Sequence, residues 1–421
     1  MQLQVKTLLN QVHPLKGFVY DDVRLVQVEG KVAPWVEATV RERKGSAPLC
    51  GNCGKPGTGY DHQPERRFGF VPLWALAVVL LYSPRRVDCK DCGIRVEAMP
   101  WAHGKSSMTI ALMCFLATWA RRLSWRDVAS AFGTSWDNVR RAVTYVVEHG
   151  LAHRDLTGIT AIGVDEIQYR KGHKYLTLVY QIDQGCRRLL WIGVDRKERT
   201  LKGFFTWFGK RRSAGLCFVC SDMWRPFINV ARRFAGGALH VLDRFHIVKN
   251  LNKAVDETRR REAAELRRGG DKVTLKDSRW CLLKRRENLT KPQRGRLRQL
   301  LKLNLKIARA YLLKEDFDHF WEYGSTALAG NFLDRWCQRA VASRIEPMKR
   351  MAGTLQTNRE LLLNYFRAKK EYSSGVVEGL NNKVRVVTRR SYGFRQLDTL
   401  KIALFHTLGR LPEPELAHRF A

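Results

Sequence analysis

Hydrophobic residues recur in short, strand-like runs through the stretch that begins at Gly158. Three runs rich in β-branched and aromatic residues are separated by short charged turns and predict three consecutive β-strands: TAIGVDEIQY, KYLTLVYQID and RRLLWIGVD. The next segments alternate between helix-like and strand-like patterns: LKGFFTWFG, GLCFVC, WRPFINVARRFAG and ALHVLD. Three meandering strands followed by alternating helix and strand predict an α/β sheet of mixed direction.

The chain on either side of this stretch follows other patterns. The N-terminal part alternates short apolar runs with glycine and proline, and a helical pattern starts near Met108. From about His246 to Lys370 the pattern is helical and very basic, and a last helix, GVVEGLNNKVRVVTRR, follows it. We therefore predict a multidomain α+β protein with four parts: an N-terminal module (1–105), a helical region (106–157), an α/β domain (158–246 and 371–421) and an all-helical insertion within that domain (247–370).

Composition adds a strong electrostatic constraint. The 421 residues are 45% hydrophobic, enough for a sizeable core, and they include 75 Lys and Arg against 40 Asp and Glu, a formal net charge of +35. So large a charge attracts polyanions, and the basic residues are spread along the whole chain, which favours a long surface that follows a phosphate backbone. Composition alone does not separate DNA from RNA, and an RNA-associated protein with solvated lysine faces is the alternative.

The sequence contains no pattern for membrane insertion or secretion. Its longest apolar stretch, 70–82, contains Pro72 and is too short for a bilayer, and the N-terminal MQLQVKTLLN lacks the apolar run of a signal peptide. We expect a cytoplasmic, nucleoid-associated protein in a reducing compartment. The ten cysteines are then interpreted as zinc ligands and buried thiols rather than as disulfides.

Four cysteines form two pairs with the spacing of zinc knuckles. Two residues separate Cys50 from Cys53, and two residues separate Cys89 from Cys92. Four thiolates satisfy a tetrahedral structural Zn²⁺ and leave no open position for catalysis. The pattern therefore predicts a structural zinc in the N-terminal module, with four buried free thiols as the alternative.

A helix, a tight glycine turn and a second helix are predicted between Trp125 and Val147. Gly133 lies at the turn, and Thr134 or Ser135 is placed to cap the second helix. A helix-turn-helix of this kind inserts its second helix into the major groove of DNA. The candidate DNA-binding residues of that helix are Ser135, Asn138, Arg140 and Arg141. An ordinary helical hairpin of the core is the alternative.

Three acidic residues occupy positions suited to a metal site. Alternation places Asp165, in the first predicted strand, on the opposite face from Val164, and Asp222 directly follows the apolar strand 216–220. Ligand sites in such sheets gather at the carboxyl ends of strands. Glu378 begins a polar stripe on the last helix that continues through Asn382, Arg385 and Arg389. Carboxylates suit Mg²⁺, and a pair of such ions activates a water and neutralises a phosphodiester. Solvated or salt-bridged acids are the alternative.

Three long runs resemble the ISL-three family of bacterial insertion-sequence transposases: GVDEIQYRKGHKYLTLVYQID, CSDMWRPFINVARRFAGGALHVLDRFHIVKNLNKAVDETRR and GVVEGLNNKVRVVTRRSYGFR. The resemblance covers nearly the whole chain. It implies a ribonuclease-H-like catalytic domain with a DDE carboxylate triad and a helical insertion between the second and third acids. Carried over, the triad falls on Asp165 in GVDE, Asp222 in SDMW and Glu378 in VVEGLNN.

Asp243 in LDRFH is a rival for the second acid. With Asp222 in that role, Asp243 and His246 resemble the D-x2-H signature that follows the second acid in related transposase groups. The alternative is that Asp243 caps a helix beginning near Arg244 and that His246 is a satisfied core histidine.

The resemblance also implies an activity. We expect an enzyme that uses Mg²⁺ or Mn²⁺ to cleave DNA at transposon ends and to transfer the freed strand to target DNA, within a homo-oligomeric synaptic complex. A cysteine-rich, zinc-binding N-terminal module is expected in the family. Basic residues of the last helix would hold phosphates near the site: Lys383, Arg385, Arg389 and Arg390. A non-catalytic DNA-binding regulator and a nuclease without strand transfer are the rival functions.

Overall fold

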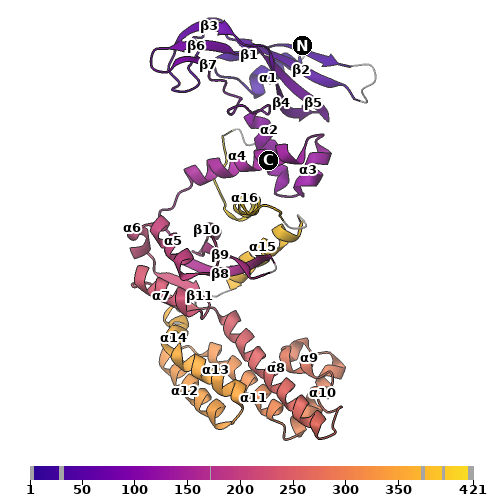
Figure 1. Cartoon of the computed structure of the whole chain (residues 1–421), viewed down its shortest axis with the longest axis vertical. Helices are drawn as coiled ribbons and strands as arrows, with labels where there is room; N and C mark the ends of the chain where they lie inside the picture. Colours follow the sequence, from indigo (N-terminus) through magenta and orange to yellow (C-terminus); the bar gives the residue numbers. More distant parts are fainter. Residues whose placement is uncertain (1–3, 28–32, 171, 371–374, 391–393, 416–421) are drawn as a thin grey trace. The chain divides into compact units, whose positions relative to one another are not determined.

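The computed structural model describes residues 4–27, 33–170, 172–370, 375–390 and 394–415 (Figure 1). The chain divides into two compact units: the first unit joins Met1–Asp155 with Val386–Ala421, and the second unit is Leu156–Arg385. Residues 371–374, where the predicted α/β domain resumes, and 391–393, in the last family-like run, lie outside the described residues. The four-part division predicted above stays a prediction. Among the described ranges, no helix is both long enough and apolar enough to cross a membrane.

The N-terminal part of the first unit consists of one short helix and two sheets. The larger sheet has the strand order β1-β2-β5-β4, and the smaller has the order β3-β6-β7. Alternating apolar residues of the larger sheet, among them Tyr20 and Phe68, pack with the fully buried Trp101. The elements are α1 (Val5–Val12), β1 (Phe18–Val26), β2 (Trp35–Glu42), β3 (Thr58–His62), β4 (Arg66–Leu73), β5 (Leu76–Tyr82), β6 (Arg85–Cys89) and β7 (Gly93–Val96).

Four further helices of the first unit pack around a second apolar core. They are α2 (Ile110–Ala120), α3 (Trp125–Ala131), α4 (Trp136–His153) and α16 (Leu397–Leu408). Leu116, Val128 and Val143 are buried between α2, α3 and α4, and Ala403 of α16 joins them. Gly133 has the positive φ of +58° that the tight turn between α3 and α4 requires. The predicted helix, glycine turn and helix are thus confirmed as structure.

A five-stranded mixed sheet forms the centre of the second unit. Its order is β10-β9-β8-β11-β12; β9 is antiparallel to both β8 and β10, whereas β11 is parallel to β8 and β12. This confirms the predicted sheet of mixed direction. The elements are β8 (Ala161–Arg170), β9 (Lys174–Gln181), β10 (Arg188–Val194), α5 (Glu198–Phe208), α6 (Lys210–Ala214), β11 (Phe218–Ser221), α7 (Arg225–Phe234) and β12 (Leu239–Leu242).

Different helices cover the two faces of this sheet. Ile162 and Val164 of β8 pack in one core with Phe204 of α5 and Phe227 of α7. On the opposite face, Gly163 of β8 lies against α15 (Gly375–Arg390), the helix predicted at the end of the domain. The sheet is therefore buried on both faces, as parallel strands require.

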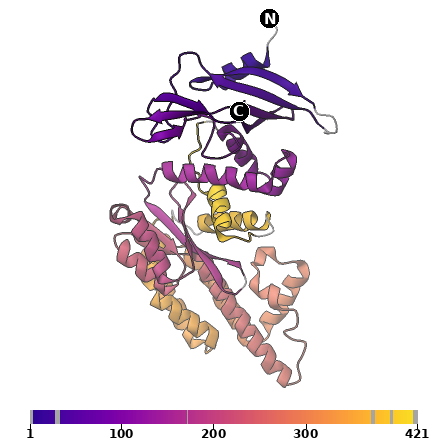
Figure 2. The same cartoon turned by 45° about the horizontal axis from the view of Figure 1, so that its top comes forward.

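The region between β12 and α15 is helical, as predicted. The long α8 leads away from the sheet, and the other helices gather along it (Figures 1 and 2). Their core contains the fully buried Trp336, Phe317 and Phe320. The elements are α8 (Arg244–Arg268), α9 (Arg279–Leu283), the 3-10 turn η1 (Arg286–Asn288), α10 (Lys291–Lys302), α11 (Lys306–Asp318), η2 (His319–Glu322), α12 (Thr326–Ala342), α13 (Glu346–Thr357) and α14 (Arg359–Arg367).

Candidate functional site

Strand register brings three aspartates to the same level at one edge of the second unit's sheet. β11 pairs with β8 up to Cys220 opposite Gly163, and β12 pairs with β11 up to Leu242 opposite Ser221. Asp222 and Asp165 each lie two residues past the last pair of β11 and β8, and Asp222 and Asp243 each lie one residue past the last pair of β11 and β12. Adjacent strands lie about 4.8 Å apart, so the three backbones present their aspartates as neighbours.

Asp165 is held by hydrogen bonds from two elements. The backbone N–H of Glu166 donates to one carboxylate oxygen at 2.7 Å, and the side-chain amide of Asn381 on α15 donates to the other. Asn381 is 4% exposed, and its own carbonyl oxygen accepts from the hydroxyl of Tyr180 at 2.7 Å. Tyr180 thus fixes the amide that orients Asp165.

Neither Asn381 nor Tyr180 was among the site residues expected from the sequence. A signal was present, because Asn381 follows Val377 by four residues and precedes Val384 by three. It therefore lies on the apolar face of α15, and it is buried there with both valines. A polar side chain on such a face needs a buried partner.

A glycine allows α15 to approach the sheet where Glu378 lies. A Cβ on Gly163 would stand 2.5 Å from Cγ2 of Val377, closer than real side chains come. Glu378, the next residue, is partly exposed and makes no hydrogen bond or ion pair with another described residue. The close approach sets Glu378 near the strand of Asp165 and leaves its carboxylate available for a ligand.

The two candidates for the second acid have different surroundings. Asp222 is partly exposed and accepts one hydrogen bond, from the backbone N–H of Trp224 at 3.0 Å. Asp243 is 5% exposed and caps α8 by accepting from the N–H of Phe245 at 2.7 Å. The cap proposed as the alternative for Asp243 is therefore present. His246 is not a satisfied core histidine, because its Nδ1 is buried without a hydrogen-bond partner among the described residues.

The acids act on one another electrostatically. Burial raises the pKa of Asp165 above the usual range of an aspartate; the charges of Asp243 and Asp222 raise it further, against the N–H of Glu166 and the charge of His246. Burial, together with Asp222 and Asp165, also raises the pKa of Glu166 to about 7, although Arg196 lies 3.9 Å from its carboxylate. Oε1 of Glu166 is buried without a partner among the described residues. Burial is thus the main cause that raises the pKa of both carboxyl groups, and the neighbouring acids add to it.

The residues of this site are chemically suited to a divalent cation, because they offer carboxylate oxygens. One of these oxygens, Oε1 of Glu166, is buried without a hydrogen-bond partner among the described residues. The oxygens of the acids do not converge on one point: within the described ranges, only the cysteine cluster brings three or more possible ligands together. The described site therefore supplies the donor chemistry for a cation rather than a closed coordination shell.

The four predicted zinc ligands come together in the first unit. The sulfur atoms of Cys50, Cys53, Cys89 and Cys92 all lie within 4.8 Å of one another. Tetrahedral zinc with Zn–S bonds of about 2.3 Å needs sulfurs roughly 3.8 Å apart. Backbone N–H groups of Cys53 and Asn52 lower the pKa of the Cys50 thiol, whereas partial desolvation and the neighbouring thiols raise the pKa of Cys53, as expected for four sulfur atoms crowded without a cation. The cluster is compatible with a tetrahedral zinc, and two of its four thiols, those of Cys53 and Cys92, are not buried.

The second helix of the helix-turn-helix begins with a side-chain cap. Ser135, one of the two proposed caps, accepts from the N–H of Asn138 at 3.1 Å, while Thr134 accepts from the amide of Asn138. Arg140 and Arg141 both pair with Asp137, at 2.9 and 2.8 Å. The guanidiniums predicted to contact DNA are therefore partly neutralised in the free protein.

The basic residues of α15 are exposed, as a phosphate-binding role requires: Lys383, Arg385, Arg389 and Arg390. Arg385 donates to the side-chain oxygen of Asn382 at 2.8 Å, and Arg390 donates to the backbone carbonyl of Arg121 at 3.0 Å. Two of the four guanidinium and ammonium groups are thus already oriented by local hydrogen bonds.

Known proteins similar to this chain share one description. A family model of the ISL3 type, described as "Transposase", matches residues 162–404. The transposase for insertion sequence element IS1001 of Bordetella parapertussis is 29% identical over 350 residues, which cover 82% of this chain and 85% of that protein. The transposase for IS1557 of Mycobacterium tuberculosis is 28% identical over 439 aligned positions, 94% of each chain. The matched region of the family model contains the acids from Asp165 to Glu378.

Proposed function

The chain belongs to the ISL3 family of transposases, and from this premise we propose that it cleaves DNA at transposon ends and joins the freed strand to target DNA, using Asp165, Asp222 and Glu378 as a DDE triad. The observation that supports the triad is the parallel pairing of β11 with β8, which ends at Cys220 opposite Gly163, two residues before Asp222 and Asp165. The strand order β10-β9-β8-β11-β12, in which β9 alone runs against the other strands, supports a ribonuclease-H-like domain made of 158–246 and 371–421, with 247–370 inserted.

The triad would hold Mg²⁺ or Mn²⁺, which activates the attacking oxygen and neutralises charge on the scissile phosphate in both hydrolysis and strand transfer. The protein's own groups prepare the site. Asn381 orients the carboxylate of Asp165, and Tyr180 fixes the amide of Asn381. Exposed cations of α15 hold DNA phosphates beside the acids: Lys383, Arg385, Arg389 and Arg390.

We assign the second acid to Asp222 because it is the more exposed of the two aspartates, although each has one carboxylate oxygen without a hydrogen bond to a described residue. Asp243 is more deeply buried and serves as the N-cap of α8, where its charge also complements the helix dipole. Asp243 and His246 then support the site from β12 and α8, and their charges act on Asp165.

The remaining parts supply DNA recognition. We propose that Cys50, Cys53, Cys89 and Cys92 bind a structural Zn²⁺ that holds the N-terminal module, and that the helix-turn-helix reads the transposon end. Joining two ends requires two active sites, so the working form is a homo-oligomer on transposon-end and target DNA. Binding to DNA would keep the protein with the nucleoid in the cytoplasm.

The test is cleavage of a plasmid that carries the element's flanking terminal repeats, with and without Mg²⁺. We expect Asp165→Asn, Asp222→Asn and Glu378→Gln each to abolish cleavage and leave DNA binding intact, because each substitution keeps the shape of the side chain and removes a ligand charge. Glu346→Gln on α13 is the matched control, since its carboxylate is exposed and pairs only with Lys349 among the described residues.

Two outcomes would change the proposal. If Asp222→Asn cleaves normally and Asp243→Asn does not, the second acid is Asp243. If the protein cleaves ends and never joins them to a target, it is a nuclease, and binding without any cleavage would favour the regulator.

A further inference from the structure

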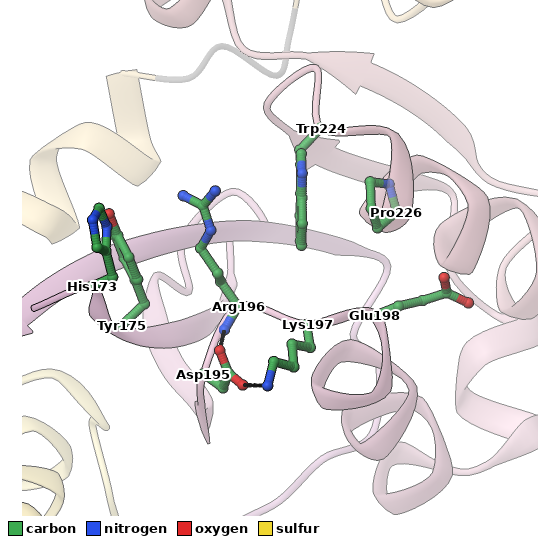
Figure 3. A pocket seen from close by; sticks show the side chains of 8 residues that line it. All are labelled: His173, Tyr175, Asp195, Arg196, Lys197, Glu198, Trp224 and Pro226. Atoms are coloured by element: carbon green, nitrogen blue, oxygen red, sulfur yellow. Dashed lines mark hydrogen bonds and ion pairs between the residues drawn. The ribbon is translucent and has the colours of Figure 1, made fainter.

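An open pocket of about 420 Å³ lies beside the acids in the second unit. It is lined from three segments: the start of β9, the loop between β10 and α5, and the loop that leads into α7 (Figure 3). Its volume falls within the range of about 300–1,000 Å³ that is usual for small-molecule sites. None of the residues assigned to the triad lines it.

The pocket combines flat aromatic surfaces with positive charge. The guanidinium of Arg196 lies 4.8 Å from the ring centre of Tyr175 and 5.5 Å from that of Trp224, so it stands between the two rings (Figure 3). His173 stacks on the outer side of Tyr175, with an angle of 29° between the rings. Rings and guanidinium planes are the surfaces on which proteins stack unpaired bases.

The loop that carries Arg196 is held in place before any ligand arrives. Asp195 has a positive φ of +85°, unusual for a residue with a side chain. Its N–H donates to the carbonyl of Tyr175 at 2.9 Å, and its carbonyl accepts from the hydroxyl of Thr177 at 2.7 Å. Its carboxylate also pairs with Lys197 at 3.1 Å. Such a locally strained but well-anchored turn is typical of a preorganised binding loop.

One contact ties this pocket to the triad, because the backbone N–H of Trp224 donates to Asp222. Arg196 lies 3.9 Å from the carboxylate of Glu166, the residue that follows Asp165 in β8. A DNA strand whose phosphate reaches the acids would therefore bring its next nucleotide to the rings. Base pairs in a duplex hide their faces, so only an unstacked base can use such a surface.

We propose that this pocket binds one unpaired nucleotide of the DNA strand next to the phosphodiester that is cut, with the base stacked on the Trp224–Arg196–Tyr175 surface and the phosphate beside Arg196 and Lys197. The inference rests on the proposed transposase chemistry, because the acids define where the strand passes. The overall charge of +35 favours a polyanionic strand over a small neutral aromatic ligand.

The test measures binding of the full-length protein, without added divalent metal, to DNA that contains the fluorescent base 2-aminopurine. One probe carries it unpaired at an end, the other carries it in the same sequence as a full duplex, and a third arm uses the free mononucleotide. We expect Trp224→Ala to weaken binding of the unpaired probe about five- to a hundred-fold and to leave the duplex affinity unchanged. Trp224→Phe should retain most of the affinity, because it keeps a ring.

Trp280→Ala is the matched control. Trp280 is 54% exposed, and the guanidinium of Arg279 lies 5.2 Å from its ring centre. This tryptophan–arginine pair resembles that of Trp224 and Arg196 but lies outside the pocket. The proposal that the pocket binds a nucleotide would be wrong if Trp224→Ala and Trp280→Ala lost equal affinity for the unpaired probe. It would also be wrong if Trp224→Ala lost equal affinity for unpaired and duplex DNA. A free mononucleotide that binds as tightly as the unpaired probe would equally overturn it.

The same protein separates failure of the pocket from failure of the proposed function. If Trp224→Ala loses affinity only for the unpaired probe while Asp165→Asn still cleaves DNA, the nucleotide pocket is supported and the assignment of the triad is wrong. If Asp165→Asn does not cleave DNA while Trp224→Ala binds both probes normally, the triad is supported and the proposed nucleotide pocket is wrong. Circular dichroism of Trp224→Phe and Trp224→Ala distinguishes either result from misfolding, since Trp224 also packs on Phe227.

Discussion

Replacing Gly163 by alanine tests how the approach of α15 to the sheet builds the acid site. A new Cβ would stand 2.5 Å from Cγ2 of Val377 and 3.3 Å from Cγ2 of Ile182. Unstrained carbon–carbon contacts lie near 3.5–4.0 Å, so α15 or the strand must shift by roughly 1 Å. Overpacking of this kind costs about 1–3 kcal/mol of stability. For a unit of this size, the unfolding temperature should fall by about 2–4 °C for each kcal/mol.

The same shift should damage activity more than stability. Glu378 follows Val377 directly, so displacement of α15 moves the third acid relative to Asp165. A misplacement of about 1 Å in catalytic geometry costs roughly a hundred-fold in rate. The assay is cleavage of the plasmid carrying terminal repeats, alongside thermal unfolding of the same preparations.

A second substitution and a control make this prediction specific. Val377→Ala removes the methyl group that clashes, so Gly163→Ala/Val377→Ala should recover much of the activity lost by Gly163→Ala. Gly379→Ala on the same helix has open space around its new Cβ and should be neutral or stabilise the helix by up to about 1 kcal/mol. Normal cleavage by Gly163→Ala, or no recovery in the double variant, would refute the reasoning.

Three further predictions concern the first unit. Purification without added metal should yield one zinc per chain, and Cys50→Ser/Cys89→Ser should lose it and unfold the N-terminal module, because metal binding and folding are coupled; elemental analysis that finds no zinc would contradict this. Asp137→Asn should tighten DNA binding and steepen its salt dependence, since it releases two arginines that now pair with it; an unchanged salt slope in titrations would argue against their contact with phosphate. Burial, with a smaller contribution from Arg121, lowers the pKa of His406 to about 3, below its unfolded value near 6.5. Between pH 6.5 and pH 3 the unfolded state therefore binds a proton at His406 that the folded state does not bind. The free energy of unfolding should fall by up to about 1.4 kcal/mol per pH unit as the pH drops from 6.5 toward 3. Unfolding measured across this range in His406→Phe should show a flatter dependence, and identical curves would refute the assignment.

The order of elements was predictable because each depends on its own neighbours in the chain. Runs of β-branched and aromatic residues between short charged turns marked β8, β9 and β10, and the glycine after α3 marked the turn to α4. The knuckle spacing of the cysteines also predicted their convergence, because each pair closes within one tight turn. The net charge of +35 pointed to a polyanionic partner without reference to any fold.

The acid site could be predicted only in part. The resemblance to a family singled out Asp165, Asp222 and Glu378, but the different surroundings of the rivals Asp222 and Asp243, including the cap that Asp243 forms on α8, are visible only in the structure. Exposure of individual side chains was equally unpredictable: Trp280 is 54% exposed, while Trp336 in a similar helical pattern is fully buried.

The sequence by itself determined the local elements, the cysteine knuckles and the basic character of this chain, since propensity, capping and charge act over a few residues. Only the tertiary structure decided that Asn381 bonds Asp165, a residue 216 positions earlier, and that Arg196 stands between Tyr175 and Trp224. Contacts of that kind depend on strand register and helix packing. They form when burial of the whole core compensates the entropy lost on closing long loops, and no local pattern encodes that balance.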